Sequence, residues 1–348
     1  MSKIKVVSIV GARPQFIKAA VISRLIAKEK NITEILIHTG QHFDDNMSAI
    51  FFDELLLPKP KYYLDINQAG HAEMTGRMLM AIEAILMKES PDMVLIFGDT
   101  NSTLAGALAA SKLNIKIAHV EAGLRSYNRR MPEEINRLLS DQLSHWLFCP
   151  TLQAVENLNK EGIQKGVLHV GDVMLDATCF VKEKNKNKSF PSLEAWMKND
   201  FGILTIHREA STESEAALLK CLQYAEAYAA SEQLILLFPV HPRTKQLMAK
   251  LGKEFDHIKP ITPLSYFELQ YALSKAKVVL TDSGGVQKES YFHQVPCITL
   301  RSETEWVETI EAGWNRLWTQ DTWLPRKAIA DYGDGHAGEM MIAALLAS

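Results

Sequence analysis

The stretch KVVLTDSGGVQKES, residues 277–290, decides the fold. An apolar run ends at Thr281-Asp282, and Ser283-Gly284-Gly285 then leads into a segment with helical character. This order predicts a buried strand, a tight turn and the N-terminus of a helix. Two adjacent glycines let the backbone approach a bulky anion, to which the Ser283 hydroxyl and the free amides of the first helical turn can donate. We expect phosphate as the ligand, although an ordinary turn that uses glycine only for a positive φ fits the same pattern.

The same alternation of strand and helix runs through the rest of the chain. Strands are predicted at 3–10, 34–39, 92–99, 115–122, 146–151, 167–172, 201–207, 233–241, 277–282 and 296–300. Helices are predicted near 16–30, 72–89, 102–112, 133–144, 152–161, 212–230, 243–254 and 264–275. Continuous apolar strands separated by amphipathic helices indicate parallel sheets covered on both faces. We therefore predict an α/β fold with two Rossmann-like, doubly wound domains that face a common cleft, because ligands of such sheets lie beyond the carboxyl ends of the strands.

Chain length also favours two domains, since 348 residues exceed one ordinary core. The lysine-rich stretch VKEKNKNKSFPS, residues 181–192, is the clearest change of composition and predicts a solvated segment near a linker. We expect the first domain at 1–172 and the second at 173–334, with a C-terminal helix at about 335–348 packing back on the first.

Composition excludes several classes of protein. A hydrophobic content of 47% and a charged content of 23% are typical of a globular protein, and a net charge of −3 argues against a nucleic-acid partner. The N-terminus lacks the pattern of a signal peptide, and no apolar run reaches membrane-spanning length, so we expect a cytoplasmic protein without a membrane partner. The four scattered cysteines predict buried, reduced thiols, and their spacing indicates no metal site.

Carboxylates follow the predicted strands of the first domain. Asp99 and Glu121 each end a buried strand, where a carboxylate is costly unless it is paired or functional. A helix N-cap is the alternative role for Asp99. Glu133 and Arg137 stand four positions apart on a predicted helix, where a simple ion pair between them is the alternative.

Basic residues occupy the equivalent places at other strand ends. Arg13 and Lys18 flank the first strand–helix turn and are candidates for phosphate or sugar contacts, although Lys18 fits an ordinary surface lysine equally well. In the second domain, His207-Arg208 and His241–Arg243 end two strands. A histidine near a diphosphate would be held cationic and could donate a proton to a leaving group. Glu289, on the helix after the glycine turn, is placed to accept from a hydroxyl pair such as a ribose.

In combination these motifs resemble the non-hydrolysing UDP-N-acetylglucosamine 2-epimerases. The resemblance covers residues 3 to about 318 and rests on GARPQFIKAA, TGQHFD, GDTNSTLAGALAA, HVEAGLRS, PEEINR, HRE, HPR and TDSGGVQKE. It implies a glycosyltransferase-B type fold and inversion at C2 of a UDP-2-acetamido sugar, for bacterial surface polysaccharide synthesis. The reaction of this family proceeds by loss of UDP, reprotonation of a 2-acetamidoglucal-like intermediate on the other face, and return of UDP.

The resemblance also implies roles for particular residues. Asp99, Glu121 and Glu133 would be the acid/base carboxylates, and His207 would assist the diphosphate. The UDP or substrate contacts would come from Arg13, Lys18, Arg137, Arg208, His241, Leu264, Leu269, Ser283, Gly284, Gly285, Glu289 and Trp306. No metal or nicotinamide cofactor is implied, because UDP is both the leaving and the returning group. A homodimer is the family expectation.

Two departures from the family pattern concern the sugar and its regulation. The usual TERPE segment reads Thr304–Glu308, TEWVE, so Trp306 replaces an arginine, and Gln15 stands where the family often has glutamate. In combination, GARPQFIKAA, HTGQHFD and the stretch from RSETEWVE to GWN are more similar to the branch acting on UDP-2,3-diacetamido-2,3-dideoxyglucuronic acid. Some bacterial members are activated by a second UDP-sugar through an arginine in a loop that here reads NQAG, residues 67–70. We expect weak or absent activation by this route, although Gln41 and His42 are retained.

Three alternatives to this function stay open. A hydrolysing epimerase would release free N-acetylmannosamine and UDP. A glycosyltransferase of the same fold would need an acceptor but no base at C2, and fold alone does not decide between the two activities. The third alternative is a catalytically silent sensor of nucleotide sugars.

Overall fold

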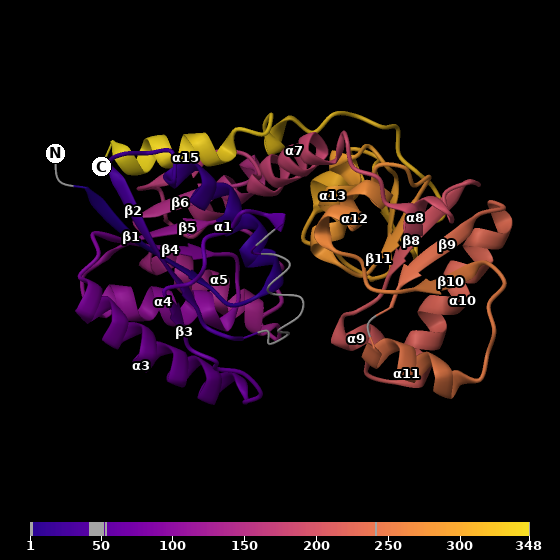
Figure 1. The fold of residues 1–348 in the computed structure, drawn as a ribbon, viewed down its shortest axis with the longest axis horizontal. Helices are drawn as coiled ribbons and strands as arrows, with labels where there is room; N and C mark the ends of the chain where they lie inside the picture. Colours follow the sequence, from indigo (N-terminus) through magenta and orange to yellow (C-terminus); the bar gives the residue numbers. More distant parts are fainter. Residues whose placement is uncertain (1–2, 42–51, 53, 241, 348) are drawn as a thin grey trace. The chain divides into compact units, whose positions relative to one another are not determined.

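The computed structural model describes residues 3–41, 52, 54–240 and 242–347. The chain divides into two compact units: unit 1 comprises Met1–Cys179 and Ala330–Ser348, and unit 2 comprises Phe180–Ile329. The chain passes from unit 1 to unit 2 within a single helix, α7 (Val173–Asn185), which is labelled in Figure 1, and it returns to unit 1 at Ala330. The lysines of the stretch predicted to be solvated are exposed on the end of this helix and just after it.

The described residues of unit 1 form a seven-stranded parallel sheet in the order β3-β2-β1-β4-β5-β6-β7. The register pairs Ile4 with Ile32 through Val10 with His38 between β1 and β2. The strands are β1 (Ile4–Val10), β2 (Ile32–His38), β3 (Tyr62–Tyr63), β4 (Met93–Phe97), β5 (Lys116–Val120), β6 (Trp146–Cys149) and β7 (Val167–His169). Because β1, β4 and β5 are neighbours and parallel, the residues that follow them lie at one edge of the sheet.

Helices cover both faces of this sheet (Figure 1). The fully buried Ile9 of β1 and Ile96 of β4 pack with Met78 and Ile82 of α3 in the same apolar cluster. The helices and the short 3₁₀ turn of unit 1 are α1 (Arg13–Ile26), α3 (His71–Glu89), α4 (Asn101–Lys112), α5 (Pro132–Leu143), α6 (Leu152–Lys160), η1 (Ala330–Tyr332) and α15 (Ala337–Leu346).

The C-terminal helix α15 approaches α1 closely. A Cβ atom added at Gly338 would lie 2.8 Å from Leu25 Cδ1 and 2.9 Å from Val21 Cγ1, so glycine allows the close contact. The carboxylate of Asp176 on α7 accepts from the backbone N–H groups of Ala337 and Gly338, which begin α15. This carboxylate therefore satisfies donors that the helix itself leaves open.

The described residues of unit 2 form a second parallel sheet, of six strands, in the order β10-β9-β8-β11-β12-β13. Its strands are β8 (Phe201–Thr205), β9 (Ile235–Pro239), β10 (Ile258–Ile261), β11 (Val279–Thr281), β12 (Cys297–Thr299) and β13 (Asn315–Leu317). Its helices are α8 (Pro191–Glu194), α9 (Glu209–Thr212), α10 (Glu215–Ser231), α11 (Pro242–Leu251), α12 (Tyr266–Leu273), α13 (Gly284–Phe292) and α14 (Val307–Glu311). Both sheets are parallel and doubly wound, which confirms the predicted fold class.

Several local expectations were wrong. Helix α1 begins at Arg13 rather than at Phe16, because Pro14 fits the first helical turn, where its missing N–H is not needed. The short strands β3, β10 and β13 were not predicted; each lies at the edge of its sheet and has little continuous apolar sequence. Three thiols are buried as expected, whereas Cys179 is exposed.

Candidate active site

Lys18 and Glu121 form a buried ion pair at the carboxyl edge of the unit 1 sheet. Lys18 comes from α1, Glu121 follows β5, and their side chains are 7% and 10% exposed. Glu121 has a φ of +70°, an uncommon value for a residue other than glycine, and its N–H donates to the carbonyl of Phe148 at 3.1 Å. Such strain is typical of functional positions. The alternative of Lys18 as a surface lysine is therefore wrong.

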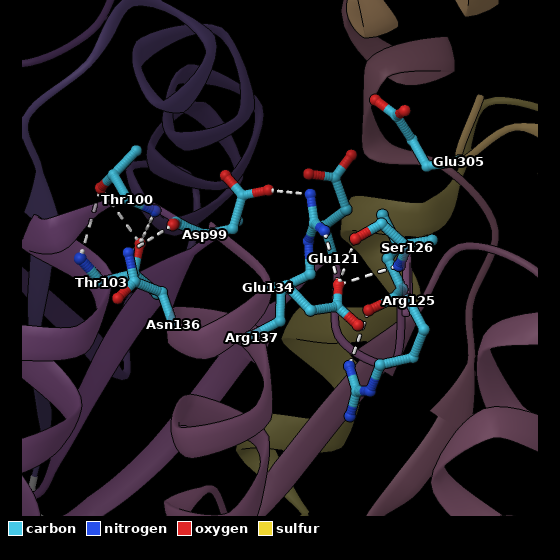
Figure 2. Close-up of polar contacts among 12 residues, drawn as sticks. Asp99, Thr100, Thr103, Glu121, Arg125, Ser126, Glu134, Asn136, Arg137 and Glu305 are labelled. Atoms are coloured by element: carbon cyan, nitrogen blue, oxygen red, sulfur yellow. Dashed lines mark hydrogen bonds and ion pairs between the residues drawn. The ribbon is translucent and has the colours of Figure 1, made fainter. Parts of the chain in front are cut away.

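Asp99 and Arg137 form a second ion pair beside the first. Arg137 on α5 donates through Nη2 to Asp99 Oδ2 at 2.5 Å and through Nη1 to Glu134 Oε2 at 2.9 Å. Figure 2 shows this chain of contacts continuing from Glu134 to Ser126. The N-cap of α4 is Thr100, whose side chain accepts from the N–H of Thr103, so the cap role considered for Asp99 is wrong.

Glu134, rather than Glu133, holds Arg137 from within α5. Its buried carboxylate also accepts from the N–H groups of Ser126 and Tyr127, at 2.8 and 2.9 Å. Burial alone would raise the pKa of Glu134, but the hydrogen bonds from Ser126 and Arg137 outweigh it and lower the pKa. Glu133 is exposed in the first turn of the helix, so the ion pair to Arg137 considered for Glu133 is made by Glu134 instead.

Gln15 links the start of α1 to the end of β4. Its Oε1 accepts from the N–H groups of Gly11 and Ala12, and its Nε2 donates to the carbonyl of Phe97 at 2.6 Å. Only an amide can both accept and donate in this way, which explains glutamine at this position. Arg13, half-buried, begins the same helix.

In unit 2 the side chain of Asp282 organises the turn after β8. This buried carboxylate accepts from the N–H of His207 at 3.1 Å and from the N–H of Arg208 at 2.9 Å. Burial would raise the pKa of Asp282, but the hydrogen bonds and charge of this turn outweigh burial and lower it. His207 Nδ1 lies 3.3 Å from Asp282 Oδ1, and the histidine side chain is 60% exposed. His207 is therefore fixed at its backbone and accessible at its ring.

The N-terminus of α13 already has a carboxylate close to it. A Cβ atom added at Gly284 would lie 2.4 Å from Glu305 Oε1, whereas Gly285 has open space beside it. Glu305 accepts from Arg301 at 2.9 Å and lies 3.5 Å from Arg208 Nη2. Two guanidinium groups thus lie next to a helix start, where positive charge and free backbone N–H groups favour an anion; phosphate at this turn stays a prediction.

Trp306 lies against the same helix start. Its side chain is 4% exposed, and Lys288 Nζ of α13 stands 3.7 Å from the centroid of its ring. The Trp306 Nε1 atom is buried and has no hydrogen-bond partner among the described residues. It lies 3.3 Å from where a Gly284 Cβ would be, so a donor is available where the helix begins. Ser283 is the N-cap of this helix, and Glu289 is buried on it.

Leu264 belongs to the apolar cluster of unit 2 that also contains Val286, and the partly buried Leu269 packs against that cluster. Their contact with the substrate stays a prediction. His241 lies outside the described residues. No helix in the described part of the chain is both long and apolar enough to cross a bilayer.

Comparison with known proteins gives consistent matches along the chain. The family model described as UDP-N-acetylglucosamine 2-epimerase matches residues 24–346. A UDP-N-acetylglucosamine 2-epimerase homolog of Methanococcus maripaludis is 51% identical over 320 residues, covering 90% of this chain and 88% of the relative. The UDP-2,3-diacetamido-2,3-dideoxy-D-glucuronate 2-epimerase of Pseudomonas aeruginosa is 48% identical over 316 residues, with the same coverage of both chains.

A solved structure extends the match to the whole fold. The crystal structure of Methanocaldococcus jannaschii UDP-GlcNAc 2-epimerase in complex with UDP-GlcNAc and UDP aligns with a TM-score of 0.87 and 40% identity. The alignment covers 99% of this chain and 100% of that one. Two parallel α/β units, the first with two carboxylate–cation ion pairs at adjacent strand ends, together with this structural match define an enzyme of the glycosyltransferase-B fold. The chain belongs to the UDP-N-acetylglucosamine 2-epimerase family and is an isomerase, which confirms the resemblance seen in its motifs.

Proposed function

We propose that the chain inverts C2 of a UDP-2-acetamido sugar by elimination and re-addition of UDP. The observation that carries this proposal is the pair of carboxylates at adjacent strand ends of unit 1, each ion-paired with a cation. Inversion at one carbon requires proton transfer on both faces, and therefore more than one positioned acid/base group. We assign proton transfer to Asp99 and Glu121, with the exposed Glu133 as the third carboxylate.

The chemistry divides between the two units. The C2–H bond is not acidic enough for simple abstraction, so UDP must leave C1 before or while the proton leaves C2. Unit 2 supplies the groups for that departure, namely the start of α13, His207 and Arg208, which stabilise charge on the leaving diphosphate. The C1=C2 intermediate then accepts a proton at C2 from the other face, and UDP adds back at C1.

We propose UDP-2,3-diacetamido-2,3-dideoxyglucuronate as the first candidate substrate and UDP-N-acetylglucosamine as the second. The segment around Trp306 and the P. aeruginosa relative, 48% identical, support the first. The M. jannaschii relative named UDP-N-acetylglucosamine 2-epimerase, 42% identical, supports the second. Trp306 offers one neutral N–H donor, whose hydrogen bond is not made within the described residues. An arginine at this position would offer a charged, bidentate donor instead, so the two residues would suit different sugars.

The test is incubation with each UDP-sugar in deuterated water, followed by NMR of the products. Epimerisation gives the C2-inverted UDP-sugar with deuterium at C2. It does so without the acceptor molecule that a glycosyltransferase would need. Release of free sugar and UDP would instead identify a hydrolysing enzyme. If neither sugar acquires deuterium at C2 or changes configuration, the proposal is wrong.

We also propose a homodimer that acts in the cytoplasm. Exposed apolar side chains on two helices of unit 1 support a dimer: Met80 and Met87 on α3 are each 66% exposed, and Ile135 and Leu139 on α5 are 44% and 45% exposed. The proposed nucleotide-sugar substrate supports the cytoplasm as the place of action. Light scattering on wild type and Ile135→Glu tests the dimer; a monomeric wild type contradicts it.

A further inference from the structure

His119, at the carboxyl end of β5, has acceptors on both of its ring nitrogens. Its Nδ1 lies 2.7 Å from Asp141 Oδ1, and its Nε2 lies 2.7 Å from the carbonyl oxygen of Gly98. A carbonyl oxygen can only accept, and an ionised carboxylate can only accept. Flipping the ring would put carbon atoms against both oxygens. Both nitrogens must therefore carry protons, which makes the ring an imidazolium although its side chain is fully buried.

The surroundings of His119 balance this charge. Asp141 also accepts from Arg125 Nη1 at 2.8 Å and from the N–H of Gly123 at 3.1 Å. Burial would raise the pKa of Asp141, but His119 and Arg125 outweigh it and lower the pKa, so the carboxylate is ionised. Arg125 is paired in turn with Glu161 at 2.7 Å. The buried set thus contains two cations and two anions, the condition under which buried charges persist.

The two hydrogen bonds of His119 hold the backbone that carries the candidate acid/base groups. Gly98, with a φ of +60°, immediately precedes Asp99. A Cβ atom at Gly98 would lie 3.5 Å from both Glu121 Oε2 and Lys18 Nζ, so this turn lies directly against the other ion pair. Through Asp141, the same ring is linked to Gly123, two residues after Glu121, and to helix α5.

We propose that His119 is a buried imidazolium that positions the Asp99 and Glu121 turns. It acts through Gly98 and Asp141 and is a positioning residue rather than a catalytic one. The positioning role rests on the proposed function, because it assumes that these carboxylates transfer protons. The charge of the His119 ring does not depend on the proposed function, and it can be measured whatever reaction the protein catalyses.

A second buried histidine of the same sheet provides a matched control. His38 ends β2 and is also fully buried, but its Nδ1 accepts from the N–H of Gly40 at 2.9 Å. An accepting nitrogen carries no proton, so His38 is neutral. In agreement, burial lowers the pKa of His38 to about 4. The structure thus assigns a positive charge to one ring and none to the other, although both are equally buried.

The first experiment is nitrogen NMR of the full chain labelled with ¹⁵N-histidine. At pH 7.5 we expect one buried ring with both nitrogens protonated, absent from the spectrum of His119→Asn, and another that is neutral. A His119 signal with one unprotonated nitrogen overturns the proposal. This measurement uses the wild-type protein and does not depend on turnover, so it separates failure of the imidazolium from failure of the epimerase assignment.

The second experiment compares two substitutions at this position. Asparagine places a donor near Nδ1 and keeps the contact to Asp141, while glutamine reaches toward Nε2 and keeps the contact to Gly98. For His119→Asn we expect a fall in kcat of about 10²-fold, the cost of misplacing a reacting group by about 1 Å, with UDP affinity within twofold of wild type. His119→Gln should recover part of kcat. Wild-type kcat in folded His119→Asn overturns the positioning role.

Discussion

Two adjacent glutamates on α5 are expected to differ in their effect on stability when each is replaced by glutamine. Glu133 is exposed, whereas the side chain of Glu134 is 1% exposed and accepts from Ser126, Tyr127 and Arg137. Glu133→Gln should leave the free energy of unfolding within about 0.5 kcal/mol of wild type. It should lower kcat by about 10²–10⁴, the usual contribution of a positioned acid or base.

Glu134→Gln should lower stability as well as activity. The amide nitrogen of glutamine would face a donor, and an unpartnered buried donor such as the Tyr127 N–H costs about 1–3 kcal/mol. Loss of the charged hydrogen bond to Arg137 costs about 1.5–3 kcal/mol more. These two costs sum to about 2.5–6 kcal/mol, and removing one partner of a buried ion pair usually costs about 3–5 kcal/mol, so we expect a loss of about 3–5 kcal/mol.

Urea unfolding of both variants, monitored by circular dichroism, measures the change in the free energy of unfolding. Steady-state kinetics measures the change in kcat. Because the native pKa of Glu134 is lowered, its stabilisation is present above the unfolded-state pKa, near 4.5, and is lost as pH falls through the native value. The difference between wild type and Glu134→Gln should therefore shrink in acid. A loss below about 1 kcal/mol at pH 7.5, or wild-type kcat in Glu133→Gln, would refute this reasoning.

Three further substitutions test other parts of the structure. Trp306→Phe removes only the unpartnered N–H, and we expect unchanged stability with a several-fold higher KM for the UDP-sugar, measured by steady-state kinetics. Arg125→Lys loses the bidentate contact to Glu161 and should lower the free energy of unfolding, measured by urea titration, by about 2–4 kcal/mol. Burial raises the native pKa of Asp176 to about 6, so its contribution to stability is full below about pH 4 and is lost as pH rises through 6. Asp176→Asn should therefore gain about 2–3 kcal/mol on wild type between pH 4 and pH 8 in urea titrations.

Much of the architecture follows from local sequence. Continuous apolar runs between amphipathic segments can bury both faces only in a parallel sheet, and this physical requirement made the fold class predictable. The same topology places residues that follow neighbouring strands at one edge, so Asp99 and Glu121 could be identified from their positions alone. The short edge strands β3, β10 and β13 could not be predicted, because a strand at the edge of a sheet can pair with its neighbour without a continuous apolar sequence.

The tertiary structure alone decided which side chains pair. Arg137 and Asp99 are 38 positions apart, Lys18 and Glu121 are 103 apart, and no local periodicity connects them. His119 and Asp141 were recognisable only as a strand histidine and a helix aspartate until strand order brought them within 2.7 Å. Helical spacing suggested Glu133 as the partner of Arg137, yet packing turned Glu134 inward. Sequence patterns report which face of an element is apolar, whereas contacts between charges depend on how separate elements meet.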